Sequence, residues 1–162
     1  MSAADPGTVR AALRDVVDPE LPFLTIEDLG VLRDVRVDDD GRVEVTITPT
    51  YSGCPAMDAI RADVERALAE GGFAGARVRT VLAPAWTTDW VTEAGRQKLE
   101  SYGVAPPAPR PERGPVPLQL SVRCPQCGSL DTCESSRFGS TACKSLWVCC
   151  SYREPFDHFK TL

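Results

Sequence analysis

Histidine is almost absent from this sequence, which holds a single one, His158, among 162 residues. A carboxylate di-iron oxygenase needs two Glu-x-x-His motifs, so one histidine excludes that type of active site. A Ser–His–Asp hydrolase would have to use the same His158, far along the chain from the loops of the N-terminal part. The scarcity of histidine therefore argues against an enzyme that acts on its own.

Several other motifs are missing. The chain has no G-x-G-x-x-G motif and no Walker loop, so nicotinamide, flavin or ATP binding has no support. The Cys-x4-Cys-x2-Cys spacing of plant-type ferredoxins is also lacking. No apolar run approaches the ~20 residues that span a bilayer, and the first residues contain no apolar signal-peptide core. We therefore expect a cytoplasmic protein that makes no use of a membrane.

The charge distribution argues against nucleic acid as a partner. Residues 1–105 carry 11 Lys/Arg against 18 Asp/Glu, whereas residues 106–162 carry 7 against 5. Phosphate contacts need a basic face, which the acidic N-terminal part cannot supply and which a net charge of +2 in the tail does not restore.

A proline-rich stretch divides the chain. Residues 105–117 contain six prolines, which cannot pair in a sheet or continue a helix, so this stretch is typical of an extended linker. The sequence thus predicts a body over 1–104, a linker over 105–117 and a cysteine-containing tail over 118–162.

Hydrophobic periodicity predicts an α+β fold. Residue spacing favours helices over 7–17, 55–70 and 88–102, and strands over 31–37, 43–47 and 77–83. Gly71-Gly72 should end the second helix, and the turn at residues 38–41 has hairpin chemistry. We expect a small mixed sheet with helices, followed by a zinc-ribbon-like β domain.

Cysteines in the tail are the strongest functional signal. Cys124 and Cys127 lie two residues apart, a spacing that lets both thiolates bind one metal ion, and Cys149 is the natural third ligand. A ribbon would carry its fourth cysteine at position 152, where this chain has Tyr152. Candidates for the fourth ligand remain open: Cys143, which could fold back across a hairpin, and also Cys133, Cys150 and His158. We expect zinc here, because so small a tail has little core of its own.

In the body, Cys54 precedes Pro55 at the start of the helix expected over 55–70. Cys54 should occupy the N-cap, where free N–H groups and the helix dipole favour a thiolate. The alternative is a buried cysteine that serves as a small apolar residue.

Acidic residues cluster upstream, with Asp18 and Glu20 in one turn and Asp28 shortly after. They could bind a hard cation or touch a reacting group, or simply order turns. Trp86 and Trp90 flank the last helix start and could form a docking patch or cover the edge of the sheet.

Three motifs of the body resemble the SufT-like iron–sulfur assembly domain. They are Asp18-Pro-Glu20, Asp28-Leu-Gly30 and Cys54-Pro55. Further motifs are similar to the D-subunit family of bacterial phenylacetyl-CoA epoxidase (phenylacetate-CoA oxygenase) systems: 86–99, 102–107, 124–129, 136–144 and 153–160. The sequence departs from that family at Tyr152 and Thr161, where the family carries cysteine.

The resemblance implies an accessory protein of aerobic phenylacetate degradation that matures or inserts the iron or iron–sulfur centre of the oxygenase or reductase. Cys54 would transiently bind iron or an iron–sulfur cluster, or accept sulfur, and Asp18 and Glu20 would shape its pocket. The family shares Cys143, which makes it the preferred fourth ligand in the tail.

Two rival hypotheses stay open at this point. One is a non-catalytic docking subunit that joins oxygenase and reductase through the ribbon and the Trp86/Trp90 patch. The other is an iron–sulfur cluster in the tail that relays electrons. The sequence also leaves open whether the body forms a homodimer.

Overall fold

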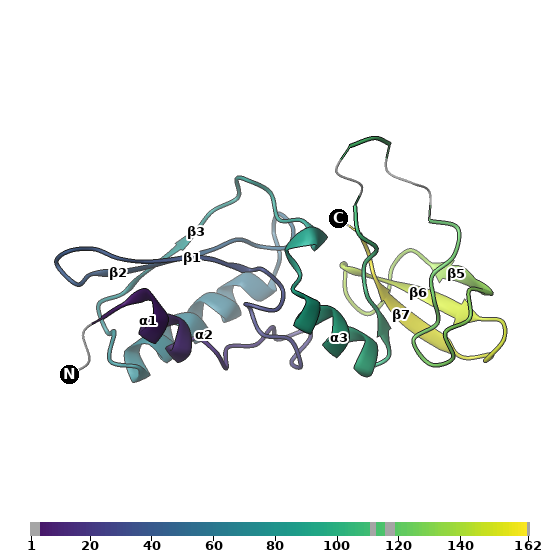
Figure 1. Cartoon of the computed structure of the whole chain (residues 1–162), viewed down its shortest axis with the longest axis horizontal. Helices are drawn as coiled ribbons and strands as arrows, with labels where there is room; N and C mark the ends of the chain where they lie inside the picture. The colour runs from purple at the N-terminus through teal and green to yellow at the C-terminus, as the bar shows by residue number, and fades with distance from the viewer. Residues whose placement is uncertain (1–3, 111–112, 116–118, 162) are drawn as a thin grey trace. The chain divides into compact units, whose positions relative to one another are not determined.

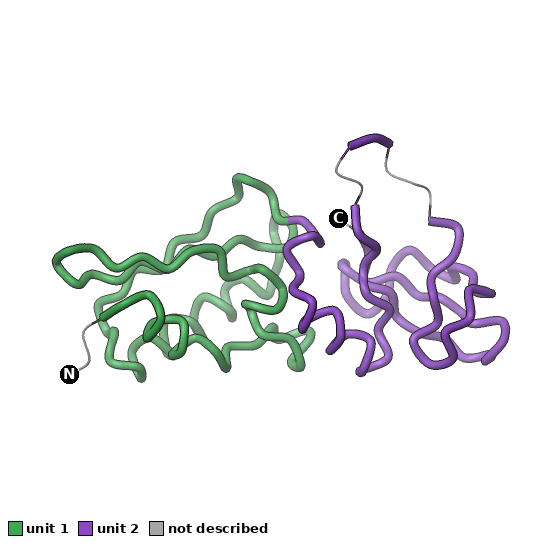
Figure 2. The backbone as a smooth tube through the Cα atoms, in the orientation of Figure 1, with its two compact units in different colours: residues 1–86 green, residues 87–162 purple. Residues whose placement is uncertain are grey.

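The structure is a computed structural model that describes residues 4–110, 113–115 and 119–161 (Figure 1). The chain forms two compact units, residues 1–86 and 87–162, which are coloured separately in Figure 2.

Unit 1 is built on a three-stranded sheet of order β1-β2-β3. Strands β1 (Leu32–Val37) and β2 (Val43–Ile47) form an antiparallel hairpin, and β3 (Arg77–Thr80) pairs parallel to β2. The hairpin closes through a turn in which Gly41 has φ +77°, a conformation that favours glycine. Strand β2 buries every second residue, Val43, Val45 and Ile47, as the period-2 pattern predicts, whereas the buried residues of β1 are Leu32 and Val35.

Two helices pack on this sheet, and Figure 1 shows them on the same side of it. Helix α1 (Pro6–Ala12) contacts β1 and α2, and α2 (Ala56–Glu70) contacts β3. Helix α2 buries one stripe, which is formed by Ala56, Ile60, Val64 and Leu68. It ends at Gly71 as expected, with Gly72 at φ +91°. No helix among the described residues is long and apolar enough to cross a membrane.

The first helix is shorter than the predicted range 7–17, because its C-cap is Leu13. Val16 instead accepts a hydrogen bond from the Ile26 amide at 3.0 Å, and Val17 forms an isolated antiparallel bridge with Thr25. The chain beyond Leu13 therefore leaves the helix and pairs in an extended conformation with residues 25–26. A local helical pattern does not predict this contact.

Unit 2 contains a four-stranded sheet of order β4-β7-β6-β5. Strand β4 (Val104–Ala105) runs parallel to β7 (Pro155–Phe159), while β6 (Lys144–Cys149) pairs antiparallel with β7 and with β5 (Thr132–Ser136). Together with unit 1, this arrangement confirms the α+β class.

The helix expected over 88–102 is interrupted. A short 3-10 turn, η1 (Thr88–Trp90), is followed by extended backbone at Val91, and α3 (Glu93–Ser101) then begins. The Thr92 side chain caps α3 by accepting from the Gly95 amide at 3.0 Å.

Residues 87–104 group with the tail by their contacts, and the predicted domain bounds at 104 and 118 stay a prediction. The pairing of β4 with β7 carries this segment into the ribbon sheet. The Arg96 guanidinium reinforces it by donating to the carbonyl oxygens of Pro107 and Thr88. Of the predicted linker, residues 111–112 and 116–117 lie outside the described part of the chain.

Trp86 is buried in the structure, with 6% of its surface exposed, and its Nε1 donates a 2.8 Å hydrogen bond to the Leu29 carbonyl. Trp90 is half-buried. The docking patch expected at these two residues is therefore not presented by Trp86, which stabilises the turn before β1 instead.

We expect Trp86→Ala to lower the free energy of unfolding by about 3–5 kcal/mol, because it removes a buried indole and its hydrogen bond. Urea denaturation measures the effect. Leu82→Ala is the control: Leu82 is 63% exposed, so its change should stay within about 0.5 kcal/mol. Equal stabilities of the two variants would contradict the structural role of Trp86.

Candidate metal centre and reactive cysteine

The first sulfur pair lies on a tight turn of unit 2. The Cys124 amide donates to the Ser129 carbonyl, and the Gly128 amide donates to the Cys124 carbonyl, both at 2.9 Å. Gly128 has φ +75°, which a glycine adopts without strain. The turn closes so tightly that Cys124 and Cys127 present their thiols to the same space.

The second turn, at the end of β6, resembles the first. The Arg153 amide donates to the Cys149 carbonyl at 2.7 Å. Arg153 has a positive φ of 62°, and Gly128 at the corresponding position of the first turn also has a positive φ. The Tyr152 amide also donates to Cys149 Sγ at 3.2 Å. Position 152 thus corresponds to position 127, but its tyrosine is 52% exposed and offers no thiolate.

Three thiols converge between these turns. The Sγ atoms of Cys124, Cys127 and Cys149 all lie within 4.8 Å of one another, and Cys127 and Cys149 are 3.5 Å apart. Tetrahedral zinc with Zn–S bonds of about 2.3 Å sets its sulfurs about 3.8 Å apart, so the three residues fit such an ion. Cys124 and Cys149 are buried and Cys127 is exposed, which leaves the cluster accessible from one side.

Hydrogen bonds prepare Cys124 to carry the negative charge. Burial raises its pKa, but amide donors at Cys127 and Gln126 and the thiols of Cys127 and Cys149 outweigh burial, so the pKa is below its usual value. At Cys127 the Ser129 amide lowers the pKa, but burial and the two neighbouring thiols raise it above its usual value overall. Metal binding at such a cluster would therefore release protons.

Cys143, expected as the fourth ligand, is not brought to this cluster. It lies just before β6, whereas Cys149 ends that strand, and six residues of strand place them about 20 Å apart. Cys143 Sγ is instead 3.0 Å from Thr141 Oγ1. The geometry therefore does not support Cys143 as a ligand.

The other candidates for a fourth ligand also lie elsewhere. His158 on β7 pairs with Ser145, near the start of β6. Cys150 is exposed, and its pKa is raised chiefly by a hydrogen bond with the Cys133 thiol, so these two cysteines face each other. Within the described residues, Cys124, Cys127 and Cys149 are the one group of three or more ligand side chains at such distances.

Cys54 lies in unit 1, one residue before the position expected from the sequence. The N-cap of α2 is Pro55, with φ −67° and ψ −20° and no side-chain capping bond. Cys54 is half-buried, its amide donates to Tyr51 at 3.3 Å, and its carbonyl accepts from Met57 at 3.2 Å. The thiol therefore belongs to the turn that leads into α2 and precedes its cap.

The upstream carboxylates order their own turns. Asp18, 7% exposed, accepts hydrogen bonds from the amides of Glu20 at 2.8 Å and Leu21 at 2.9 Å. The Thr25 amide donates to Asp28 Oδ2, and the Asp28 amide donates to Thr25 Oγ1, both at 3.0 Å. A role for Asp18 and Glu20 in the Cys54 pocket stays a prediction.

Backbone hydrogen bonds nevertheless connect these turns to the loop of Cys54. The Ile26 amide donates to the Val16 carbonyl at 3.0 Å. The Val31 amide donates to the Ile26 carbonyl and the Thr48 amide to the Val31 carbonyl, both at 2.9 Å. Thr48 begins the loop that contains Cys54. The acidic turns and the cysteine loop are thus parts of one hydrogen-bonded framework.

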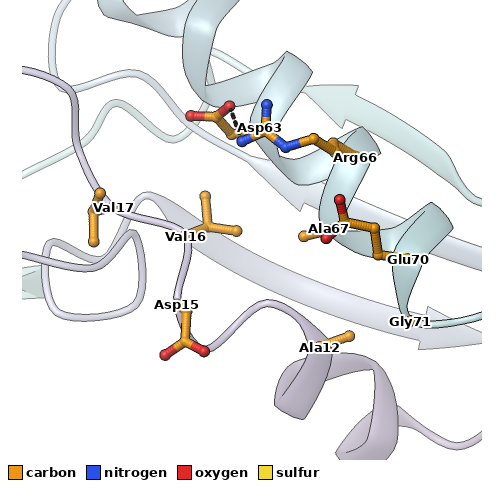
Figure 3. Close-up of a pocket in the computed structure, with 9 residues that line it drawn as sticks. All are labelled: Ala12, Asp15, Val16, Val17, Asp63, Arg66, Ala67, Glu70 and Gly71. Carbon is orange, nitrogen blue, oxygen red and sulfur yellow. Dashed lines mark hydrogen bonds and ion pairs between the residues drawn. The ribbon is translucent and has the colours of Figure 1, made fainter.

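A cavity of about 440 Å³ lies between α1, the segment that follows it, and α2 (Figure 3). Its α2 lining comes from residues 63–71, the C-terminal half of the helix, and includes the ion pair of Asp63 and Arg66 at 2.7 Å. Cys54 precedes the opposite end of α2, so this cavity does not contain the thiol.

Family models match both units. The model described as "Iron-sulfur cluster assembly protein" matches residues 7–83, and the model described as "PaaD zinc beta ribbon domain" matches residues 108–160. The chain is also 47% identical over 152 residues to the D subunit of the Escherichia coli (strain K12) "Putative 1,2-phenylacetyl-CoA epoxidase", covering 94% of this chain and 90% of that one. The chain belongs to this D-subunit family.

Unit 1 has relatives of its own. The Staphylococcus aureus (strain USA300) "Fe-S protein maturation auxiliary factor SufT" is 38% identical over 85 residues, covering 52% of this chain and 96% of that protein. A solved structure of a conserved hypothetical protein from Thermotoga maritima matches with a TM-score of 0.53 and 32% identity, over 61% of this chain and 98% of that one. The resemblance inferred from the motifs of the body is confirmed.

We expect Cys149→Ser to lower zinc affinity by roughly 100-fold or more, because it removes one of three clustered thiolates. Cys143→Ser should retain full zinc binding, since Cys143 lies at the other end of β6. Titration against a chromophoric chelator measures both variants. Equal losses in the two variants would contradict the three-sulfur cluster.

Tyr152→Cys should raise zinc affinity by roughly 100-fold, because it places a thiolate at the turn position that corresponds to Cys127. The same chelator competition measures the gain, and Tyr152→Ser controls for loss of the ring. Unchanged affinity in Tyr152→Cys would show that position 152 does not face the cluster.

Proposed function

We propose that this chain is an accessory factor of a phenylacetyl-CoA ring-epoxidising oxygenase, which delivers or inserts an iron or iron–sulfur centre through Cys54. The proposal is supported by one combination above all: a half-buried thiol at the entrance of α2, within a unit that matches iron–sulfur assembly proteins. The naming of the Escherichia coli relative as part of an epoxidase supports the same client system.

In this proposal, iron or a cluster is the cargo of Cys54 and not a resident cofactor. The thiol loses its proton, and Sγ forms a bond to the incoming iron that later breaks when a client ligand replaces it. Partial exposure of Cys54 suits this exchange, since a fully buried sulfur could not reach a client. Asp18 and Glu20 would act by holding the turn that supports the loop framework.

The ribbon would hold zinc as a structural ion. Cys124, Cys127 and Cys149 supply three thiolates, and the fourth position is left to a ligand from outside this turn pair. Zinc would supply bonding energy that holds the two turns together in a unit with a small core. An iron–sulfur cluster in the tail is the less favoured occupant, because such clusters use four cysteine ligands.

The docking alternative keeps the same oxygenase and reductase as partners but gives Cys54 no chemical role. Burial of Trp86 removes half of the surface on which that alternative rested. It would therefore have to use other exposed apolar residues, such as Phe138 or Leu120.

Co-expression of the oxygenase and reductase with this chain tests the proposal. We expect Cys54→Ala to reduce the iron content and epoxidation activity of the client to the level seen without the chain. The variant should remain folded, since Cys54 makes no side-chain cap of α2.

Cys133→Ser is the matched control, because Cys133 is exposed and lies outside both proposed sites. It should leave client iron unchanged. A fully iron-loaded and active client in the presence of Cys54→Ala would overturn delivery through this thiol and favour docking.

A further inference from the structure

A second cavity, of about 360 Å³, lies in unit 2, away from the thiol cluster. Its lining includes Ser145 and Trp147 from β6 and His158 from β7. Ser145 and His158 are cross-strand partners, four residues along β6 from Cys149. The cavity therefore lies toward the opposite end of β6 from Cys149 and is separate from the thiol cluster.

His158 lines this cavity as a neutral imidazole. It is 4% exposed, and burial lowers its pKa to about 4. Trp147 Nε1 donates to Ser145 Oγ at 3.0 Å, so the Ser145 proton is free to point at His158 Nδ1, 3.4 Å away. In the tautomer in which Nδ1 accepts from Ser145, the ring proton resides on Nε2.

The other ring nitrogen, Nε2, lacks a hydrogen-bond partner in the described part of the chain. Among the described residues, His158 Nε2 and Thr161 Oγ1 are the buried side-chain polar atoms that lack one, and both residues line this cavity. Buried donors are normally paired, because leaving them unpaired is costly. Two unpaired groups at one cavity indicate that a ligand with acceptor atoms completes their bonding.

Charges around the cavity indicate the sign of that ligand. Lys160 and Arg137 line it together with one carboxylate, Glu134, which is 3.9 Å from Arg137. The Lys160 ammonium also lies 5.2 Å from the centre of the Phe138 ring, which is 76% exposed. The cavity thus combines a net positive charge, unpaired donors and an aromatic surface.

We propose that this cavity binds a small organic carboxylate that carries an apolar or aromatic group. The carboxylate oxygens accept from His158 Nε2 and Thr161 Oγ1 and are attracted by Lys160 and Arg137, while the apolar part lies against Phe138. A metal ion does not suit the cavity, since Lys160 and Arg137 would repel it.

Benzoate titration of the full chain tests this site, with inorganic phosphate and benzyl alcohol as comparison probes. His158 is the one histidine in the sequence, so its imidazole NMR signals can be assigned without ambiguity. We expect saturable benzoate shifts of the Nε2 signal, and no saturable shift with either comparison probe. Absence of a benzoate shift would overturn the proposal, and so would equal shifts with phosphate, which would show a general anion effect.

Variants make the test specific when calorimetry measures benzoate affinity. Lys160→Gln should weaken binding roughly 10-fold or more, and His158→Phe should abolish it while the ring volume is kept. His158→Gln retains an N–H donor and should bind, which separates loss of the donor from misfolding. Arg61→Gln in unit 1 is the charge control and should bind normally. Equal affinity in Lys160→Gln and Arg61→Gln would contradict the site.

Discussion

The thiol cluster and the hydrophobic core of unit 2 share residues, because Cys124 and Cys149 belong to both. Ala105, Val122, Trp147 and Phe156 belong to the same cluster of buried residues. A bound ion would therefore hold the same strands that the aromatic residues pack between.

In unit 1 the buried residues of the sheet and of helix α2 stabilise the fold, and the Cys54 loop does not. The sheet and the buried stripe of α2 fix both ends of the loop that contains Cys54. Asp18 and Asp28 use their oxygens on nearby amides, so they order the framework beside that loop. A thiol on such a rigid support can be exposed to a client without loss of the fold, which is the arrangement that a delivery factor needs.

Local patterns predicted the parts of the fold that depend on local interactions. The alternation of β2 and the stripe of α2 were visible in the sequence, as were the Cys124–Cys127 pair and Cys149. The parts that depend on distant pairing were not. The parallel pairing of β4 with β7 joins residues about 50 positions apart, and Cys143 is held away from Cys149 because the residues between them form the extended strand β6. The buried His158 gave no local signal, since its cavity arises from pairing across β6 and β7.

Zinc X-ray absorption spectroscopy of the purified full chain tests the three-sulfur cluster most directly, because it counts the atoms bound to the ion. We expect one zinc per chain with three sulfur neighbours at about 2.3 Å and one lighter neighbour. Four sulfur neighbours would contradict the cluster as described, because a fourth cysteine would then have to move to it. A protein purified without any bound metal would contradict the structural role assigned to the ion.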